Sequence, residues 1–138
     1  MDEENPIIKH LVVSGGGTYG LSAYGALREL NKNGFWDLSN IKSCHATSIG
    51  TVILAMILCK YEWDVLDDFI IKRPWNTVFK FDISQLFDIF DRGGIFDKSV
   101  IFNVLKPIFS GVDMDMDITM KEFYEKTGVE FYIYSVEI

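Results

Sequence analysis

A run of glycines directly after a short apolar segment constrains this chain more than any other feature. The segment 8–14 is rich in β-branched residues, which is typical of a buried strand, and the sequence GGGTYG follows it at positions 15–20. Residues 21–32 then carry apolar side chains at helical spacing, and Asn33-Gly34 is a stop signal. Consecutive glycines leave backbone N–H groups free to point into one small volume, because no Cβ interferes. At the start of a helix such donors suit an anion, either a phosphate or a developing oxyanion.

A second strand, turn and helix follow the first. Residues 41–47 read as a strand, and 49–60 as a buried helix, with the sequence ATSIG at positions 46–50 between them. This sequence fits a nucleophile elbow with alanine in place of the first glycine. Such an elbow turns on its serine, here Ser48, and needs small residues on both sides, here Ala46 and Gly50. The motif by itself also fits an ordinary N-cap serine.

The two turns together favour chemistry over capping. Each lies at the C-terminal end of an expected strand and at the start of a helix, so in a parallel sheet both lie at the same edge, where ligands bind. A serine nucleophile beside backbone donors is the arrangement for acyl transfer. The last expected elements are a helix at 63–73, a short helix after Ser84, a helix capped by Asp97, a helix opened by the capping box TMKE at 119–122, and a strand at 130–138. This alternation predicts an α/β protein with a mainly parallel sheet.

Composition sets the broad class. The chain has 138 residues, of which 49% are hydrophobic and 24% charged, so we expect one domain with a real core spanning 1–138. The formal net charge of −7 shows no basic footprint, which argues against nucleic-acid binding and against electrostatic capture by an anionic membrane. It leaves room for a lipid substrate reached through apolar contact.

Cysteine usage and the N-terminus bear on the compartment. Cys44 and Cys59 make neither a disulfide framework nor a metal site, and the acidic start MDEENP is no signal peptide. The longest apolar run, 52–59, is too short for a membrane span, which needs about 20 residues. We therefore expect an intracellular protein, cytoplasmic or peripherally membrane-associated, that is not secreted.

With these features the sequence resembles the patatin-like phospholipases. The resemblance rests on GGGTYG after a strand, Ser48 in ATSIG, GIFD at 94–97 and TMKEFYEKTGV at 119–129, and it covers nearly the whole chain. It implies a three-layer α/β/α fold and a serine acyl hydrolase of lipid esters or phospholipids, with a Ser-Asp dyad, no cofactor, no metal and possible peripheral membrane contact. The role of nucleophile carries over to Ser48, and the role of oxyanion hole to Gly15, Gly16 and Gly17.

Two departures from the family pattern stand out. Tyr19 occupies a position where the family usually has arginine or lysine. The catalytic aspartate of the family lies in a D-G-G or D-G-A motif after a later strand, and this chain has no such motif, since Asp91 precedes a helix. The chain thus resembles the N-terminal part of the domain, C-terminally incomplete. A serine hydroxyl is a poor nucleophile without a base, and His45, on the strand before Ser48, is expected to be a core or packing residue.

The same sequence admits other interpretations. The absent aspartate and Tyr19 favour a non-catalytic lipid-binding or interaction module on the same fold. The pattern G-x-G-x-x-G also occurs in dinucleotide-binding folds, but these need an acidic residue at the end of the second strand, which here ends in CHAT. The sequence DMDMD at 113–117 lacks the glycine and glutamate of a calcium loop, so we expect a solvated acidic turn. The aromatic residues between 79 and 90 are expected to be core, in part lining an acyl groove or touching a membrane.

Overall fold

The computed structural model describes residues 6–75 and 98–136. Two compact units make up the chain: one combines residues 1–61 with 118–138, and the other spans 62–117. Three predictions lie outside the described residues: the short helix after Ser84, the aromatic stretch between 79 and 90, and the GIFD segment with its cap Asp97.

A parallel sheet forms the centre of the first unit. Its strands are β1 (His10–Val13), β2 (Ser43–Ala46) and β3 (Glu130–Ile133), in the order β1-β2-β3. In the register, His10 is opposite Ser43, and Ser43 is opposite Glu130. The predicted α/β class and the parallel pairing are confirmed, although each strand is shorter than its apolar segment.

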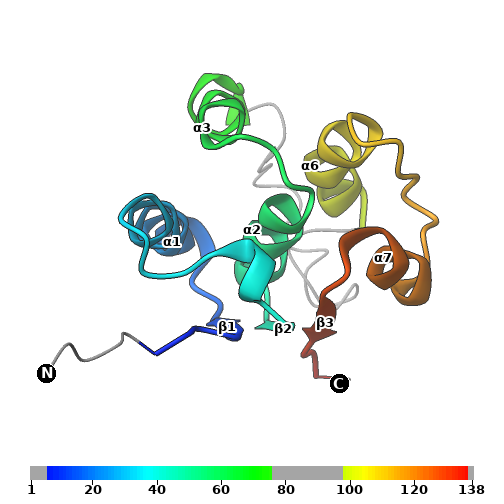
Figure 1. Ribbon diagram of the computed structural model, residues 1–138. Coiled ribbons are helices and arrows are strands. Elements are labelled where there is room, and N and C mark those ends of the chain that lie inside the picture. The colour runs from blue at the N-terminus through cyan, green and yellow to red at the C-terminus, as the bar shows by residue number, and fades with distance from the viewer. Residues whose placement is uncertain (1–5, 76–97, 137–138) are drawn as a thin grey trace, which may run out of the picture. The chain divides into compact units, whose positions relative to one another are not determined.

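Helices of this unit cover one face of the sheet. The helices α1 (Leu21–Lys32), α2 (Ile49–Leu58) and α7 (Met120–Thr127) lie on the same side of the strands (Figure 1). Side chains alternate accordingly, since Leu11 and Val13 are buried whereas Val12 between them is 78% exposed. In the described part of this unit the opposite face of the sheet carries no helix, so one of the two helical layers implied by the family resemblance is seen here.

The helix α2 is the core of the unit. Every side chain from Ile53 to Leu58 is buried, and Leu54 has no exposed surface. A helix that is apolar on all sides has to be enclosed by protein. Within the described residues, no helix combines the length and the apolar character that crossing a bilayer requires.

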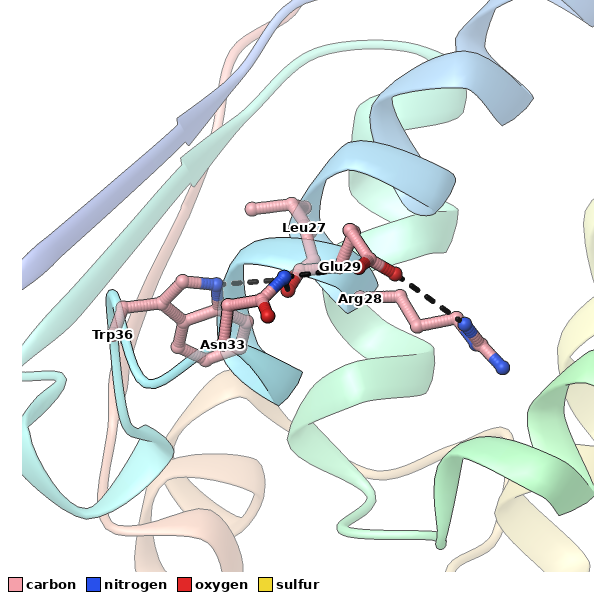
Figure 2. Close-up of polar contacts among 5 residues, drawn as sticks. All are labelled: Leu27, Arg28, Glu29, Asn33 and Trp36. Atoms are coloured by element: carbon pink, nitrogen blue, oxygen red, sulfur yellow. Dashed lines mark hydrogen bonds and ion pairs between the residues drawn. The ribbon is translucent and has the colours of Figure 1, made fainter.

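The end of α1 shows why its predicted boundary was accurate. The side-chain amide of Asn33 donates to the carbonyl of Glu29 at 2.9 Å, and Gly34 adopts φ 74°. The indole N–H of the buried Trp36 donates to the carbonyl of Leu27 at 2.9 Å (Figure 2). The backbone amides of Gly34 and Phe35 donate to the carbonyls of Asn31 and Leu30, both at 2.9 Å, and so satisfy carbonyls that the last helical turn leaves without partners. The chain then passes through the 3-10 turn η2 (Leu38–Asn40) into β2.

The second unit contains α3 (Trp63–Lys72) and α6 (Lys98–Ser110). The guanidinium of Arg73 links them: it donates to the carbonyls of Asn103 and Val104 in α6 and lies over the ring of Phe69, 4.8 Å from its centroid. The sequence spaces Ile101, Leu105 and Ile108 along one face of this helix. Ile101 is 54% exposed, and the buried side chains of α6 are Val104, Leu105, Ile108 and Phe109.

Candidate active site

Ser48 occupies a sharp turn between β2 and α2. Its backbone has φ 52° and ψ −129°, a left-handed conformation that residues other than glycine rarely adopt. The amide N–H of Gly50 donates to the carbonyl of Thr47 at 3.0 Å, and that of Thr51 to the carbonyl of Ser48 at 2.9 Å, so the helix starts at once. Ser48 is exposed, and its hydroxyl makes no capping hydrogen bond to α2. The backbone thus has the strand-to-helix turn of an elbow, and the side chain does not act as an ordinary N-cap.

Gly50 and Ala46, the small residues around the turn, have different surroundings. A Cβ on Gly50 would lie 2.4 Å from the carbonyl oxygen of Val13 and 2.9 Å from that of Ser14, so no side chain fits there. Ala46 is 2% exposed on the helix-covered face of β2. Ala46, the other small residue of the expected elbow, is not among the nearest neighbours of a Cβ on Gly50. Instead, the end of β1 sets the limit at Gly50.

The glycine loop lies against the serine. A Cβ on Gly15 would be 3.1 Å from the Cβ of Ser48 and 3.8 Å from its Oγ. The loop then enters the 3-10 turn η1 (Gly17–Gly20), in which Gly17 has φ 53°. Gly20 packs on the start of α2, since a Cβ there would meet Ile49 at 2.3 Å. The structure therefore brings together the two turns that the sequence placed on one edge of the sheet.

Backbone donors of this loop are free of internal partners. In the described part of the chain, no backbone hydrogen bond is donated by Gly15, Gly16 or Gly17, and the first one in the loop runs from Tyr19 to the carbonyl of Gly16 at 3.1 Å. Of the three residues, Gly15 lies against Ser48. N–H groups without a partner can donate hydrogen bonds to a negatively charged oxygen. Gly16 has φ 173°, which any residue adopts, so its place in the run is not explained by backbone strain.

The other flank of the turn is tied to the third strand. The Thr47 hydroxyl donates to the carbonyl of Tyr134 at 3.0 Å, and the amide of Tyr134 donates to the carbonyl of Ala46 at 2.9 Å. The amide of Thr47 also donates to the carbonyl of Val13 at 3.3 Å. Thr47 thus holds the C-terminal ends of the strands on both sides next to Ser48. Sequence reasoning missed this positioning role, because a threonine at a strand end has no pattern that reveals its partner.

Comparison with known proteins identifies the family of this chain. The family model described as Patatin-like phospholipase matches residues 11–132. The chain belongs to the patatin-like phospholipase family. It is also 30% identical over 90 residues to "Uncharacterized protein R571" of Acanthamoeba polyphaga mimivirus, an alignment that covers 65% of this chain and 30% of that protein. The chain thus spans about a third of the length of that relative. No solved structure matches the chain significantly.

The D-G-G or D-G-A motif that carries the dyad aspartate in the family does not occur in these 138 residues. His45, the titratable residue nearest to Ser48 in sequence, is engaged elsewhere: its Nε2 lies 2.9 Å from the hydroxyl of Ser43 and its Nδ1 lies 2.9 Å from the hydroxyl of Tyr134. It packs against Tyr132, with ring centroids 4.8 Å apart. This contact lies on the face of the sheet opposite α1, α2 and α7, called the open face below, and not in the core. His45 therefore has a packing role, as expected, but its partners are Tyr132, Tyr134 and Ser43 and not core side chains.

The two thiols do not compete with Ser48 as nucleophiles. Cys44 and Cys59 are both buried, and burial raises the pKa of each thiol to about 12. A thiol in this state is protonated at neutral pH and inert, since the thiolate is the reactive form.

Proposed function

We propose that this chain carries the nucleophile and the oxyanion site of a lipid acyl hydrolase of the patatin-like type. The observation that supports this most is the position of Ser48, in a left-handed turn between strand and helix with Gly15 directly against it. Membership of the family supports a lipid ester as the substrate class.

In the proposed reaction the Ser48 oxygen attacks the ester carbonyl carbon. The carbonyl oxygen becomes an oxyanion that accepts hydrogen bonds from the N–H groups of Gly15, Gly16 and Gly17. The C–O bond to the alcohol then breaks, the alcohol leaves with the proton taken from Ser48, and an acyl-enzyme remains. Water attacks that ester and releases the fatty acid. The proton transfers need a base, and in this family that base is an aspartate from a motif that these 138 residues do not contain.

Fluorophosphonate labelling tests the nucleophile. A fluorophosphonate probe should form a covalent adduct on Ser48, located by mass spectrometry, and Ser48→Ala should remove it. Ser22→Ala, at an exposed serine on α1, is the matched control and should label like the parent chain. An adduct that persists at the same rate in Ser48→Ala would contradict the assignment.

The oxyanion site is tested separately. Gly15→Ala places a methyl 3.1 Å from the Cβ of Ser48, whereas the control Gly25→Ala places one where nothing lies within 4 Å. The methyl leaves the backbone N–H in place but forces the loop and Ser48 apart, which moves the oxyanion donors out of position. Losing one such donor costs about 10²–10³ in rate, so we expect Gly15→Ala to slow labelling at least tenfold and Gly25→Ala to leave it unchanged. Equal rates in the two variants would remove the loop from the mechanism.

A second candidate is a lipid-binding module without catalysis. It is favoured by Tyr19, which is 87% exposed on the glycine loop in place of the cation usual in the family, and by the absence of a D-G-G or D-G-A motif from these 138 residues. This function predicts binding to phospholipid vesicles by the folded chain, no adduct with the probe, and unchanged binding in Ser48→Ala.

A further inference from the structure

The sheet face that carries no helix in the described residues holds a connected set of imidazole and hydroxyl groups. His10 lies on β1, Ser43 and His45 lie on β2, and Tyr134 follows β3. His10 is the register partner of Ser43, and His45 lies two residues further along β2, so these side chains project from the same face. None of these groups takes part in the proposed hydrolysis.

The two histidines converge on one oxygen. His10 Nδ1 lies 2.8 Å from the Ser43 hydroxyl oxygen, and His45 Nε2 lies 2.9 Å from the same atom. A hydroxyl has a single proton, so at most one of these ring nitrogens receives it and the other must donate its own N–H. A ligand that accepts lone pairs from both nitrogens would replace the hydroxyl between them.

His45 is oriented as a metal-binding histidine would be. Its second nitrogen, Nδ1, lies 2.9 Å from the hydroxyl of Tyr134, and its ring stacks on Tyr132 with an interplanar angle of 6°. Histidines that bind metals use one nitrogen for the metal and usually fix the other in a hydrogen bond, which sets the ring orientation. His10 is exposed, so its ring can turn toward a shared ion while His45 stays in place.

We propose that His10 Nδ1 and His45 Nε2 bind a divalent transition metal ion of the class that prefers imidazole, such as Zn²⁺, Ni²⁺ or Cu²⁺. No cluster of three or more His, Cys, Asp or Glu residues suited to a metal occurs in the described part of the chain, so water completes the coordination. The ion would link β1 to β2 across the open face. Affinity should rise from Ni²⁺ to Cu²⁺ and fall again at Zn²⁺, and the hard ions Mg²⁺ and Ca²⁺ should not bind.

Imidazole NMR offers a direct test, because the chain has two histidines. The probe is Zn²⁺, added to the ¹⁵N-labelled chain at pH 7.5. We expect the ¹⁵N resonances of His10 Nδ1 and His45 Nε2 to shift together and to saturate at one ion per chain, while Mg²⁺ leaves them unchanged. Shifts of one ring only, or no saturation at one equivalent, would overturn the proposal.

Variants separate metal binding from a structural network. His10→Ala, at an exposed position, should weaken Zn²⁺ binding at least tenfold in calorimetry, and His45→Ala should do the same. Ser43→Ala should keep or increase the affinity, because it removes the hydroxyl that competes for both nitrogens. Ser48→Ala should bind Zn²⁺ like the parent chain, so this result is independent of the proposed hydrolysis. Loss of binding in Ser43→Ala, or full binding in His10→Ala, would contradict the site.

Discussion

The backbone conformation of Ser48 distinguishes the serine of an elbow from a serine that caps a helix. A serine that caps a helix has extended backbone angles and accepts a hydrogen bond from the first turn. Ser48 has φ 52° and makes no such bond. A residue held in a left-handed conformation costs of order 1–3 kcal/mol and persists only where the surroundings enforce it. Here the surroundings are tight on both sides of Ser48, since Gly15 lies against its side chain and Gly50 lies against the end of β1.

Gly50→Ala should be strongly destabilising, because its methyl would meet the backbone carbonyl of Val13, which cannot rotate away. We expect the free energy of unfolding to fall by about 2–3 kcal/mol, the upper part of the usual range for overpacking. Gly25→Ala in α1 should instead raise it by about 0.5–1 kcal/mol, since the site is open and glycine is a poor helix former. Urea denaturation measures both, and equal midpoints for the two variants would contradict the steric argument.

The cysteine thiols give a second prediction at the residue scale. Because burial raises the pKa of both Cys44 and Cys59 to about 12, the folded chain should react with Ellman's reagent at pH 8 far more slowly than a free thiol. In denaturant both cysteines should react at once. Fast reaction of either thiol in the folded protein would show that its helix or strand opens locally.

At the scale of elements, the helix caps explain which boundaries the sequence predicted well. The bounds of α1 and α7 agree with the prediction, because stop signals and a capping box are local and act through neighbouring residues. The strands were predicted too long, because strand ends depend on which partner lies alongside. Alternation along β2 puts His45 and Ser43 on one face. The parallel register that brings His10 to them is set by packing and could not be read from the sequence.

The capping box of α7 predicts a pH-dependent stability. The hydroxyl and the backbone amide of Thr119 both donate to the carboxylate of Glu122, and these hydrogen bonds hold the pKa of that carboxyl below its ordinary value of 4.5. A carboxyl with a lowered folded-state pKa stabilises the fold above its ordinary pKa and loses that contribution as the pH falls through the folded-state pKa. Glu122→Gln should therefore be less stable than the parent chain at pH 7, and the difference should shrink at pH 3. A constant difference in urea midpoint across this range would contradict the linkage.

Removing the capping hydroxyl of Thr119 should also lower the stability of the fold. Thr119→Ala leaves the amide of Glu122 without its side-chain acceptor and should lower stability by about 1 kcal/mol. Amide hydrogen exchange should accelerate first in the opening turn of α7, and much less in α1. Uniform acceleration in both helices would show that the cap acts through global stability.

At the scale of the whole molecule, the sequence predicted the features that depend on neighbouring residues, and it predicted the family. It placed the glycine loop and the serine turn at one sheet edge, and the structure puts Gly15 against Ser48. It did not predict the tie from Thr47 to Tyr134, nor the exposure of Ile101, because both depend on segments distant in sequence. The roles of Ser48 and of the glycine N–H groups remain predictions, since geometry shows position and labelling shows reactivity.

The open sheet face predicts how the whole chain behaves in salt. Val12 is 78% exposed there, and Tyr132 and Tyr134 are exposed as well. Apolar surface of this kind favours contact between copies, while the net charge of −7 opposes it. Raising the salt shortens the screening length from about 10 Å at 0.1 M to about 3 Å at 1 M. The weight-average mass in sedimentation equilibrium should therefore rise with sodium chloride concentration. Val12→Glu should suppress that rise, whereas Ile71→Glu, which adds the same charge at an exposed site on α3, should suppress it much less. Equal suppression by the two variants would show that net charge, and not the sheet face, controls the association.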